Sequence, residues 1–106
     1  KVLKIDGKTE KISLLAESYP GKNGMYIGCG VVGKRMYCAP YNTPRVLKID
    51  AETDKSSLLE EEYPDMWKWL GCAPALSAVY CAPFSHNSVL KIDAKTDKSS
   101  LLAGVY

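Results

Sequence analysis

The sequence predicts an all-β fold built from a repeated unit, and three observations support this prediction. The segment Val-Leu-Lys-Ile-Asp occurs three times, at residues 2–6, 46–50 and 89–93, and such a period is the first signal of a repeat architecture. Apolar and polar side chains alternate along each copy, as they do on a strand with one buried face. No stretch of the chain shows the apolar spacing of a helix.

Each copy of this strand is followed by a predicted turn and a return strand. The segments 50–55 and 93–98 contain Asp and Thr, and Asp side chains favour turns because they accept hydrogen bonds from backbone amides two residues later. We therefore expect hairpin loops at these two segments, each followed by a strand that contains Ser-Leu-Leu. The turn explains the recurrent Asp6, Asp50 and Asp93, and the pattern of an EF-hand calcium loop is absent from the sequence.

Two further strands precede Val-Leu-Lys-Ile-Asp in its second and third copies. The first is aromatic and apolar, at residues 25–29 and 67–72. The second contains Tyr-Cys-Ala-Pro, at residues 35–40 and 78–83. Gly33-Lys34 is the predicted turn between the two strands in the earlier copy. Each complete repeat thus contains four short strands joined by turns.

Four antiparallel strands in about 40–45 residues are typical of one blade of a β-propeller. Residues 1–20 contain only the outer two strands of such a blade, whereas residues 21–64 and residues 65–106 contain four each. The sequence therefore predicts a partial β-propeller of about two and a half blades, whereas closed propellers have roughly four to eight. Its open ends would expose strand edges, so we expect another protein segment to cover them.

The repeat also resembles a known family. Tyr-Cys-Ala-Pro-Tyr-Asn, a short link, Val-Leu-Lys-Ile-Asp-Ala-Glu-Thr-Asp-Lys and then Trp-x-Trp-Leu-Gly are similar to the YVTN-type propeller repeat. The order is still more similar to tandem repeats of uncharacterised propeller-like proteins of dinoflagellate and haptophyte algae. The resemblance covers nearly the whole chain and implies a propeller fold and an algal source. It brings no catalytic residues, and it implies that the aromatic strand is innermost and the Ser-Leu-Leu strand outermost.

The composition argues against two classes of partner. The 106 residues carry a formal net charge of +2 with acidic and basic residues interspersed, so no basic run is present that would bind a nucleic-acid backbone. The longest apolar stretches are far shorter than a membrane span. No signal peptide is visible, and because the chain begins with Lys1 we expect a processed product or a piece of a longer protein.

The four cysteines form two pairs with the same spacing. Cys29 and Cys38 are nine residues apart, and so are Cys72 and Cys81, which differs from the closely spaced pairs of zinc sites. If each pair flanks a tight turn, its members face each other across a hairpin, with Cβ atoms about 4.5–5.5 Å apart. A disulfide needs roughly 3.5–4.5 Å. We therefore favour reduced thiols over disulfides, and both over metal or redox chemistry.

Aromatic side chains are candidates for a ligand platform, but large rings more often pack between layers, and we favour packing. The residues concerned are Tyr26, Tyr37, Trp67, Trp69, Tyr80 and Phe84. Trp67 is the best candidate for an exposed ring because it opens a strand beside a loop. His86 lies in a polar link, where a solvated residue is favoured over a catalytic base because no nucleophile elbow is present in the sequence.

Lysines recur at two positions of the repeat. One set is Lys4, Lys48 and Lys91, and the other is Lys11, Lys55 and Lys98. We expect both sets to keep the outer strands soluble and to discourage edge-to-edge pairing.

We expect a non-enzymatic structural or interaction module that docks on a larger assembly or belongs to a longer propeller. The incomplete blade count and the lack of converging polar residues motivate this expectation, and we predict no catalytic residue, metal or cofactor. The predicted contact residues are Val2, Leu3, Lys4 and Ile5 at the first strand, and Trp67, Trp69 and His86. The face around residues 89–102 should also be covered. The algal resemblance implies an accessory subunit of a plastid complex, such as a photosystem.

Two other functional classes stay open. A propeller enzyme of the lactonase or dehydrogenase type would need acidic or His ligands at a central channel, where the inner strands here offer Trp, Gly, Cys and Ala. A small-ligand or glycan binder would use Trp67, Trp69 and the polar links at the rim of a blade.

Overall fold

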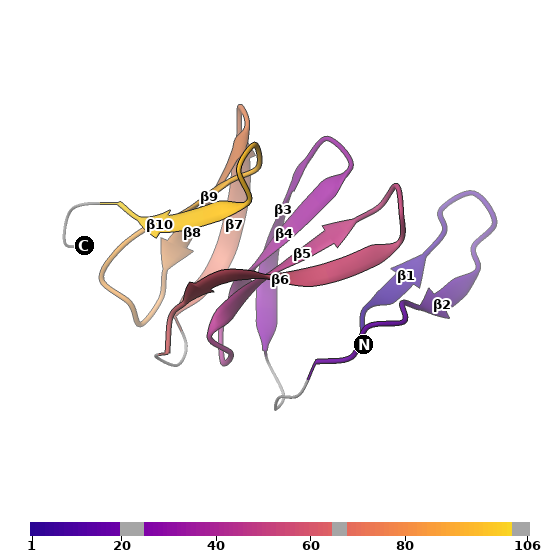
Figure 1. The fold of residues 1–106 in the computed structure, drawn as a ribbon, viewed down its shortest axis with the longest axis horizontal. Coiled ribbons are helices and arrows are strands. Elements are labelled where there is room, and N and C mark those ends of the chain that lie inside the picture. Colours follow the sequence, from indigo (N-terminus) through magenta and orange to yellow (C-terminus); the bar gives the residue numbers. More distant parts are fainter. Residues whose placement is uncertain (20–24, 65–67, 103–106) are drawn as a thin grey trace.

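The structure is a computed structural model that describes residues 1–19, 25–64 and 68–102. Within these residues it contains ten strands and no helix, which confirms the predicted all-β class. The strands form three antiparallel sheets, one of two strands and two of four (Figure 1). None of the described residues belongs to a helix that could cross a membrane.

The two-stranded sheet is a hairpin at the start of the chain, here called the N-terminal hairpin. Its strands are β1 (Leu3–Ile5) and β2 (Ile12–Leu14), which pair antiparallel with Leu3 opposite Leu14. It contains the first copy of the repeated strand and its return strand, as predicted.

Two four-stranded sheets follow, and in each one the strands that are neighbours in sequence are also neighbours in space. The middle sheet has the order β3 (Tyr26–Val32), β4 (Arg35–Pro40), β5 (Arg45–Asp50) and β6 (Lys55–Glu62). The C-terminal sheet has the order β7 (Trp69–Ala75), β8 (Ala78–Pro83), β9 (Leu90–Asp93) and β10 (Lys98–Leu101). The repeated strand is third along both sheets, as the sequence predicts.

The turns fall where the sequence predicts them. In each copy the Asp that ends the repeated strand accepts a hydrogen bond at its Oδ1 atom from the amide two residues later, at 2.8–2.9 Å. The residue four positions after that Asp has a left-handed backbone, with φ between 55° and 59°, and Asp tolerates this conformation better than most residues. The three left-handed residues are Glu10, Asp54 and Asp97. The turn role predicted for Asp6, Asp50 and Asp93 is therefore confirmed.

The three sheets stand in chain order with their faces turned toward one another, so that they fan out from the N-terminal hairpin to the C-terminal sheet (Figure 1). The middle sheet therefore presents one face to the N-terminal hairpin and the other to the C-terminal sheet. We call the contact between the N-terminal hairpin and the middle sheet interface I. The contact between the middle and C-terminal sheets is interface II.

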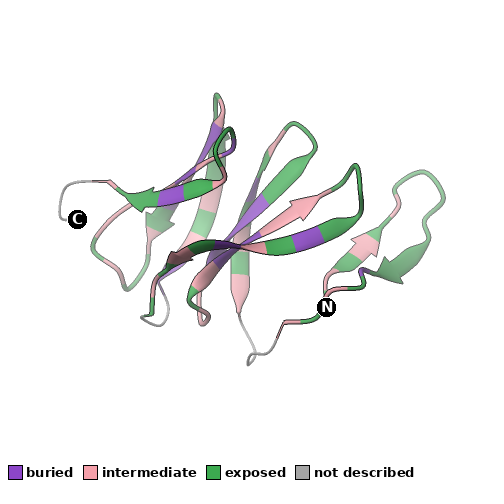
Figure 2. Ribbon diagram, in the orientation of Figure 1, coloured by how far each residue is buried: buried purple, intermediate pink, exposed green. Residues whose placement is uncertain are grey.

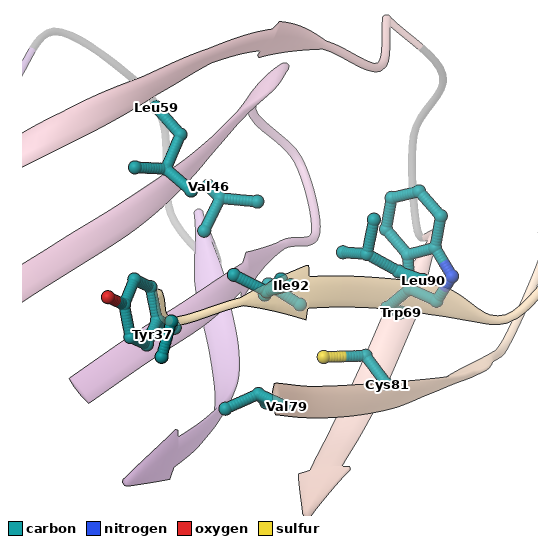
Figure 3. Close-up of a cluster of buried hydrophobic side chains, with 10 residues drawn as sticks. Tyr37, Val46, Leu59, Trp69, Val79, Cys81, Leu90 and Ile92 are labelled. Atoms are coloured by element: carbon teal, nitrogen blue, oxygen red, sulfur yellow. The ribbon is translucent and has the colours of Figure 1, made fainter. Parts of the chain in front are cut away.

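The hydrophobic core lies at interface II, where side chains from both four-stranded sheets meet (Figure 3). Its largest members are Tyr37, Val46 and Leu59 from the middle sheet and Trp69, Val79, Leu90 and Ile92 from the C-terminal sheet. The N-terminal hairpin is mostly exposed or half-buried by comparison (Figure 2). Its four aliphatic strand residues, Leu3, Ile5, Ile12 and Leu14, are between 56% and 67% exposed.

The cysteines are adjacent as predicted, but the expectation of reduced thiols is wrong. Cys29 lies opposite Cys38 in the β3–β4 ladder, and Cys72 lies opposite Cys81 in the β7–β8 ladder. Both pairs form disulfides in the structure. The two Cα atoms of each pair are 4.0 Å apart, closer than an average facing pair, and this proximity brings the sulfur atoms together.

Candidate interaction site

An equivalent Lys–Asp ion pair joins the two sheets at interface I and at interface II, because the residues that form it recur with the repeat. At interface I, Lys4 Nζ lies 2.7 Å from Asp54 Oδ2, and at interface II, Lys48 Nζ lies 2.5 Å from Asp97 Oδ2. The solubility role expected for these two lysines is therefore incomplete. The left-handed turn of the following sheet brings a carboxylate to each of them, which the spacing of the lysines along the chain does not reveal.

A second recurrent contact joins a glutamate of one sheet to a serine of the next. At interface I, Glu17 Oε1 accepts hydrogen bonds from the amide and hydroxyl of Ser56, at 2.8 and 3.0 Å. At interface II, Glu61 Oε1 accepts the same two bonds from Ser99, at 2.9 and 3.0 Å. In each case the serine hydroxyl also bonds the hydroxyl of the tyrosine two residues after the glutamate. These tyrosines are Tyr19 and Tyr63, at 2.7 and 2.9 Å.

Interface II adds a hydrogen bond to the ion pair. The Tyr37 hydroxyl donates to Asp97 Oδ1 at 2.6 Å. Burial alone would raise the pKa of Asp97, but the bonds from Lys48 and Tyr37 outweigh it, so the pKa lies below its ordinary value. Burial, followed by the bond to Asp97, raises the pKa of Tyr37 to about 12. At neutral pH the carboxylate is therefore charged and the phenol keeps the proton that it donates.

The glutamates of the second contact are held ionised by similar means. The amide of Ser56 is the main cause of the lowered pKa of Glu17. For Glu61, burial acts in the opposite direction, but the two hydrogen bonds from Ser99 outweigh it and lower the pKa. Both interfaces therefore use charged acceptors whose bonds are stronger than those of neutral groups.

Among the described residues, interface II alone brings together the first strands of two sheets, β3 and β7. A Cβ atom at Gly28 in β3 would lie 2.1 Å from the carbonyl oxygen of Leu70 in β7, a distance that no side chain can adopt. Gly28 is thus required by the close approach of another backbone. Interface I has no counterpart, because the N-terminal hairpin contains only the strands that correspond to β5 and β6.

The structure places the predicted aromatic contact residues in different environments. Trp69 is fully buried, packs edge-on against Tyr63 with ring centroids 5.3 Å apart, and donates from Nε1 to the carbonyl of Ser88 at 2.9 Å. The packing role is therefore confirmed for Trp69, which is not available as a surface platform. His86 is half-buried against Trp69, with ring centroids 4.9 Å apart. The expectation that it is a fully solvated loop residue is therefore wrong. Trp67 lies outside the described residues.

One buried charged residue was not predicted. Lys68 is fully buried, and its Nζ atom donates to the carbonyl oxygen of Thr43 in the middle sheet at 3.0 Å. The equivalent position of the preceding repeat is Met25, so the repeat itself contains no signal for this lysine. It ties the start of β7 to the link between β4 and β5.

The predicted edge residues of the first strand divide between two faces. Lys4 contributes to interface I, whereas Leu3 and Ile5 lie on the opposite face and are exposed. The Val2 carbonyl accepts a hydrogen bond from the Leu15 amide at 2.9 Å and so closes the hairpin. In the part of the chain that the structure describes, β1 pairs with β2 alone, which leaves its other edge without a strand.

A cleft of about 350 Å³ opens between the turns of the middle and C-terminal sheets. Its charged lining residues have both signs and are Lys34, Arg35, Asp50, Glu52 and Lys95. Within residues 1–19, 25–64 and 68–102, no three His, Cys, Asp or Glu side chains gather in a way that could hold a metal ion. No protein-family model matches the chain, and a search of curated proteins finds no significant match.

Proposed function

We propose that this chain is a partial β-propeller that acts as a structural or interaction module, either docked on a larger protein assembly or as part of a longer propeller. The observation that carries this proposal is the contrast between its inner and outer surfaces. Consecutive sheets are joined by a recurrent set of contacts, whereas the two outward faces expose residues whose equivalents in the middle sheet lie between two neighbouring sheets. In repeat arrays, each inner unit presents such surfaces to its neighbours, whereas terminal repeats carry a polar outer face.

The strand order supports the propeller form of this proposal. Each four-stranded sheet is a simple antiparallel meander, and the sheets face one another in chain order. Radial repetition of four-stranded meanders is how propellers are built. The N-terminal hairpin then corresponds to the outer half of a blade, and a partner strand would pair with the free edge of β1.

A plastid complex, such as an algal photosystem, is one concrete form of the assembly. This form rests on the resemblance of the repeat to algal propeller-like proteins, because fold alone does not define a partner. The protein would then be an accessory subunit without catalytic chemistry of its own.

Hydrogen exchange on the isolated chain and on the native particle that contains it tests the proposal. We expect the amides of β1 and of the C-terminal sheet to exchange more slowly in the particle. A partner would pair with the free edge of β1 and cover the outward face of that sheet. The amides of β4, which lies between two other strands of the middle sheet, should differ little. A folded, monodisperse isolated chain with the same protection at both ends as in the particle would contradict the proposal.

A further inference from the structure

The outward face of the C-terminal sheet, which points away from interface II, repeats the face that the middle sheet uses at interface II. In the middle sheet, Tyr37 and Lys48 lie opposite each other in the β4–β5 ladder and both bind Asp97. In the C-terminal sheet, Tyr80 and Lys91 lie opposite each other in the β8–β9 ladder, 43 residues later along the chain. They occupy the face opposite to the buried core residues, because side chains alternate along a strand.

The burial of equivalent residues shows that this outward face lacks a layer that interface II has. Tyr37 and Ala39 are fully buried in the middle sheet. Of their equivalents in the C-terminal sheet, Tyr80 is half-buried and Ala82 is exposed. Among the residues that the structure describes, the side chains of Tyr80 and Lys91 make no hydrogen bond or ion pair, although the side chains of their equivalents Tyr37 and Lys48 share a carboxylate.

Gly71 provides an independent observation. It is the equivalent of Gly28, where the backbone of Leu70 leaves no room for a Cβ atom. Around Gly71, in contrast, a Cβ atom would meet nothing within 4 Å. Glycine weakens a strand interior and is expected where another backbone approaches closely. A strand lying over Gly71 would account for this glycine as Leu70 accounts for Gly28, although Gly71 also stands next to the register shift of β7.

We propose that the outward face of the C-terminal sheet is the docking face for a further unit of the same repeat. This unit would carry a first strand like β7, whose backbone lies over Gly71, and an aspartate in a left-handed turn that binds Lys91 and Tyr80. The inference rests on the proposed function and names the kind of partner. Charge complementarity with Lys91 and continuity with interface II both favour this occupant.

A second copy of the chain fits this docking face less well than a further repeat unit does. Its N-terminal hairpin offers Glu10 at the position of Asp97 and an exposed face with Leu3 and Ile5. It has Ile12 where Ser99 stands, however, and no strand that corresponds to β7. It would therefore leave Gly71 uncovered.

An extended chain tests the inference directly. Residues 64–106 are appended after Tyr106, which stands 43 residues after Tyr63, so the repeat continues in register. The probe is this added unit, which contains its own copies of Leu70 and Asp97. In the original 106-residue chain, Gly71→Val should change Tm little, because the added side chain meets open space. In the extended chain, Gly71→Val should lower Tm by about 8 °C or more, since it would block the added unit.

Gly28→Val in the original chain is the matched control, because it blocks an interface that is already formed. A milder pair of variants covers the case in which valine disturbs the sheet itself. Tyr80→Phe removes one hydroxyl, and it should be neutral in the original chain and lower Tm in the extended chain. Tyr37→Phe should lower Tm in both chains, because its hydroxyl binds Asp97 in both.

The outcomes separate this inference from the proposed function. If Gly71→Val and Tyr80→Phe have the same effect in the original and extended chains, the added unit does not dock and the inference is overturned. The proposed function would still stand, because a partner at β1 is tested separately by hydrogen exchange. If the original chain instead self-associates and Gly71→Val or Lys91→Glu abolishes that association, the occupant is a second copy and the inference is also overturned.

Discussion

Interfaces I and II share their polar contacts but differ in what lies beneath them. Both contain a Lys–Asp ion pair and a Glu–Ser contact. Only interface II adds the apolar core around Trp69 and the close approach of Gly28 to Leu70. At interface I, the aliphatic side chains of the hairpin strands point away from the middle sheet and stay exposed.

This difference separates the contacts that orient the sheets from those that stabilise them. An exposed ion pair contributes about 0–1 kcal/mol, whereas burial of one large apolar side chain contributes about 1.5–3 kcal/mol. The shared polar contacts therefore set which sheet faces which and at what register. The burial of inner strands supplies most of the free energy, so the N-terminal hairpin should be the least stable part of the molecule.

The largest expected effect comes from the core of interface II. Trp69→Ala should lower the free energy of unfolding by about 3–5 kcal/mol, because it leaves a large cavity. Leu14→Ala at the exposed face of the N-terminal hairpin should change it by less than about 0.5 kcal/mol. Urea unfolding followed by circular dichroism measures both. Equal effects of the two substitutions would contradict the view that burial at interface II supplies most of the free energy.

The two disulfides sharpen the comparison, because they close loops of the same length next to different interfaces. Cys81 belongs to the core of interface II, whereas Cys38 lies on the face toward interface I. Replacing either pair by serine should cost about 2 kcal/mol from the lost cross-link. The Cys72/Cys81 replacement should cost more, because it also places a hydroxyl in the apolar core. A larger cost for Cys29/Cys38, measured by thermal unfolding, would reverse the assignment of the core.

The ion pairs should show a smaller difference of the same sign. Asp97→Asn should lower the free energy of unfolding by about 1–2 kcal/mol, because the carboxylate binds both Lys48 and Tyr37. Asp54→Asn should cost less than about 0.5 kcal/mol, because its pair with Lys4 is more exposed. Asparagine keeps the preference for the left-handed turn, so the change isolates the charge. Similar losses in chemical unfolding would argue against the role of Tyr37.

The smallest expected effect is the pH dependence of the Asp97 contact. Its pKa in the folded protein lies below the ordinary value of 3.8, so the carboxylate contributes its full stability above pH 3.8. That contribution is lost as the pH drops from 3.8 through the lowered folded-state value. Urea unfolding between pH 6 and pH 3 should show a shallower loss for Asp97→Asn than for the unsubstituted protein. Identical slopes would mean that Asp97 is not held ionised by its partners.

The sequence alone determined the strands, their order and their turns. Alternating apolar residues specify a strand, and an Asp at the end of a strand specifies a turn through its own backbone contacts, so these features depend on neighbours along the chain. The facing position of Cys29 and Cys38 follows from the same local register. The repeat also revealed that residues 1–20 contain only half of the strands found in the later copies.

The tertiary structure alone decided which face of each sheet meets the next. It paired Lys48 with Asp97, 49 residues away, and placed Lys68 against Thr43. It also brought the cysteines close enough to form disulfides. These features depend on contacts between separate sheets or on small changes in strand spacing. A periodic sequence contains equivalent residues in every copy, and only their surroundings in space place a backbone over Gly28 and leave Gly71 open.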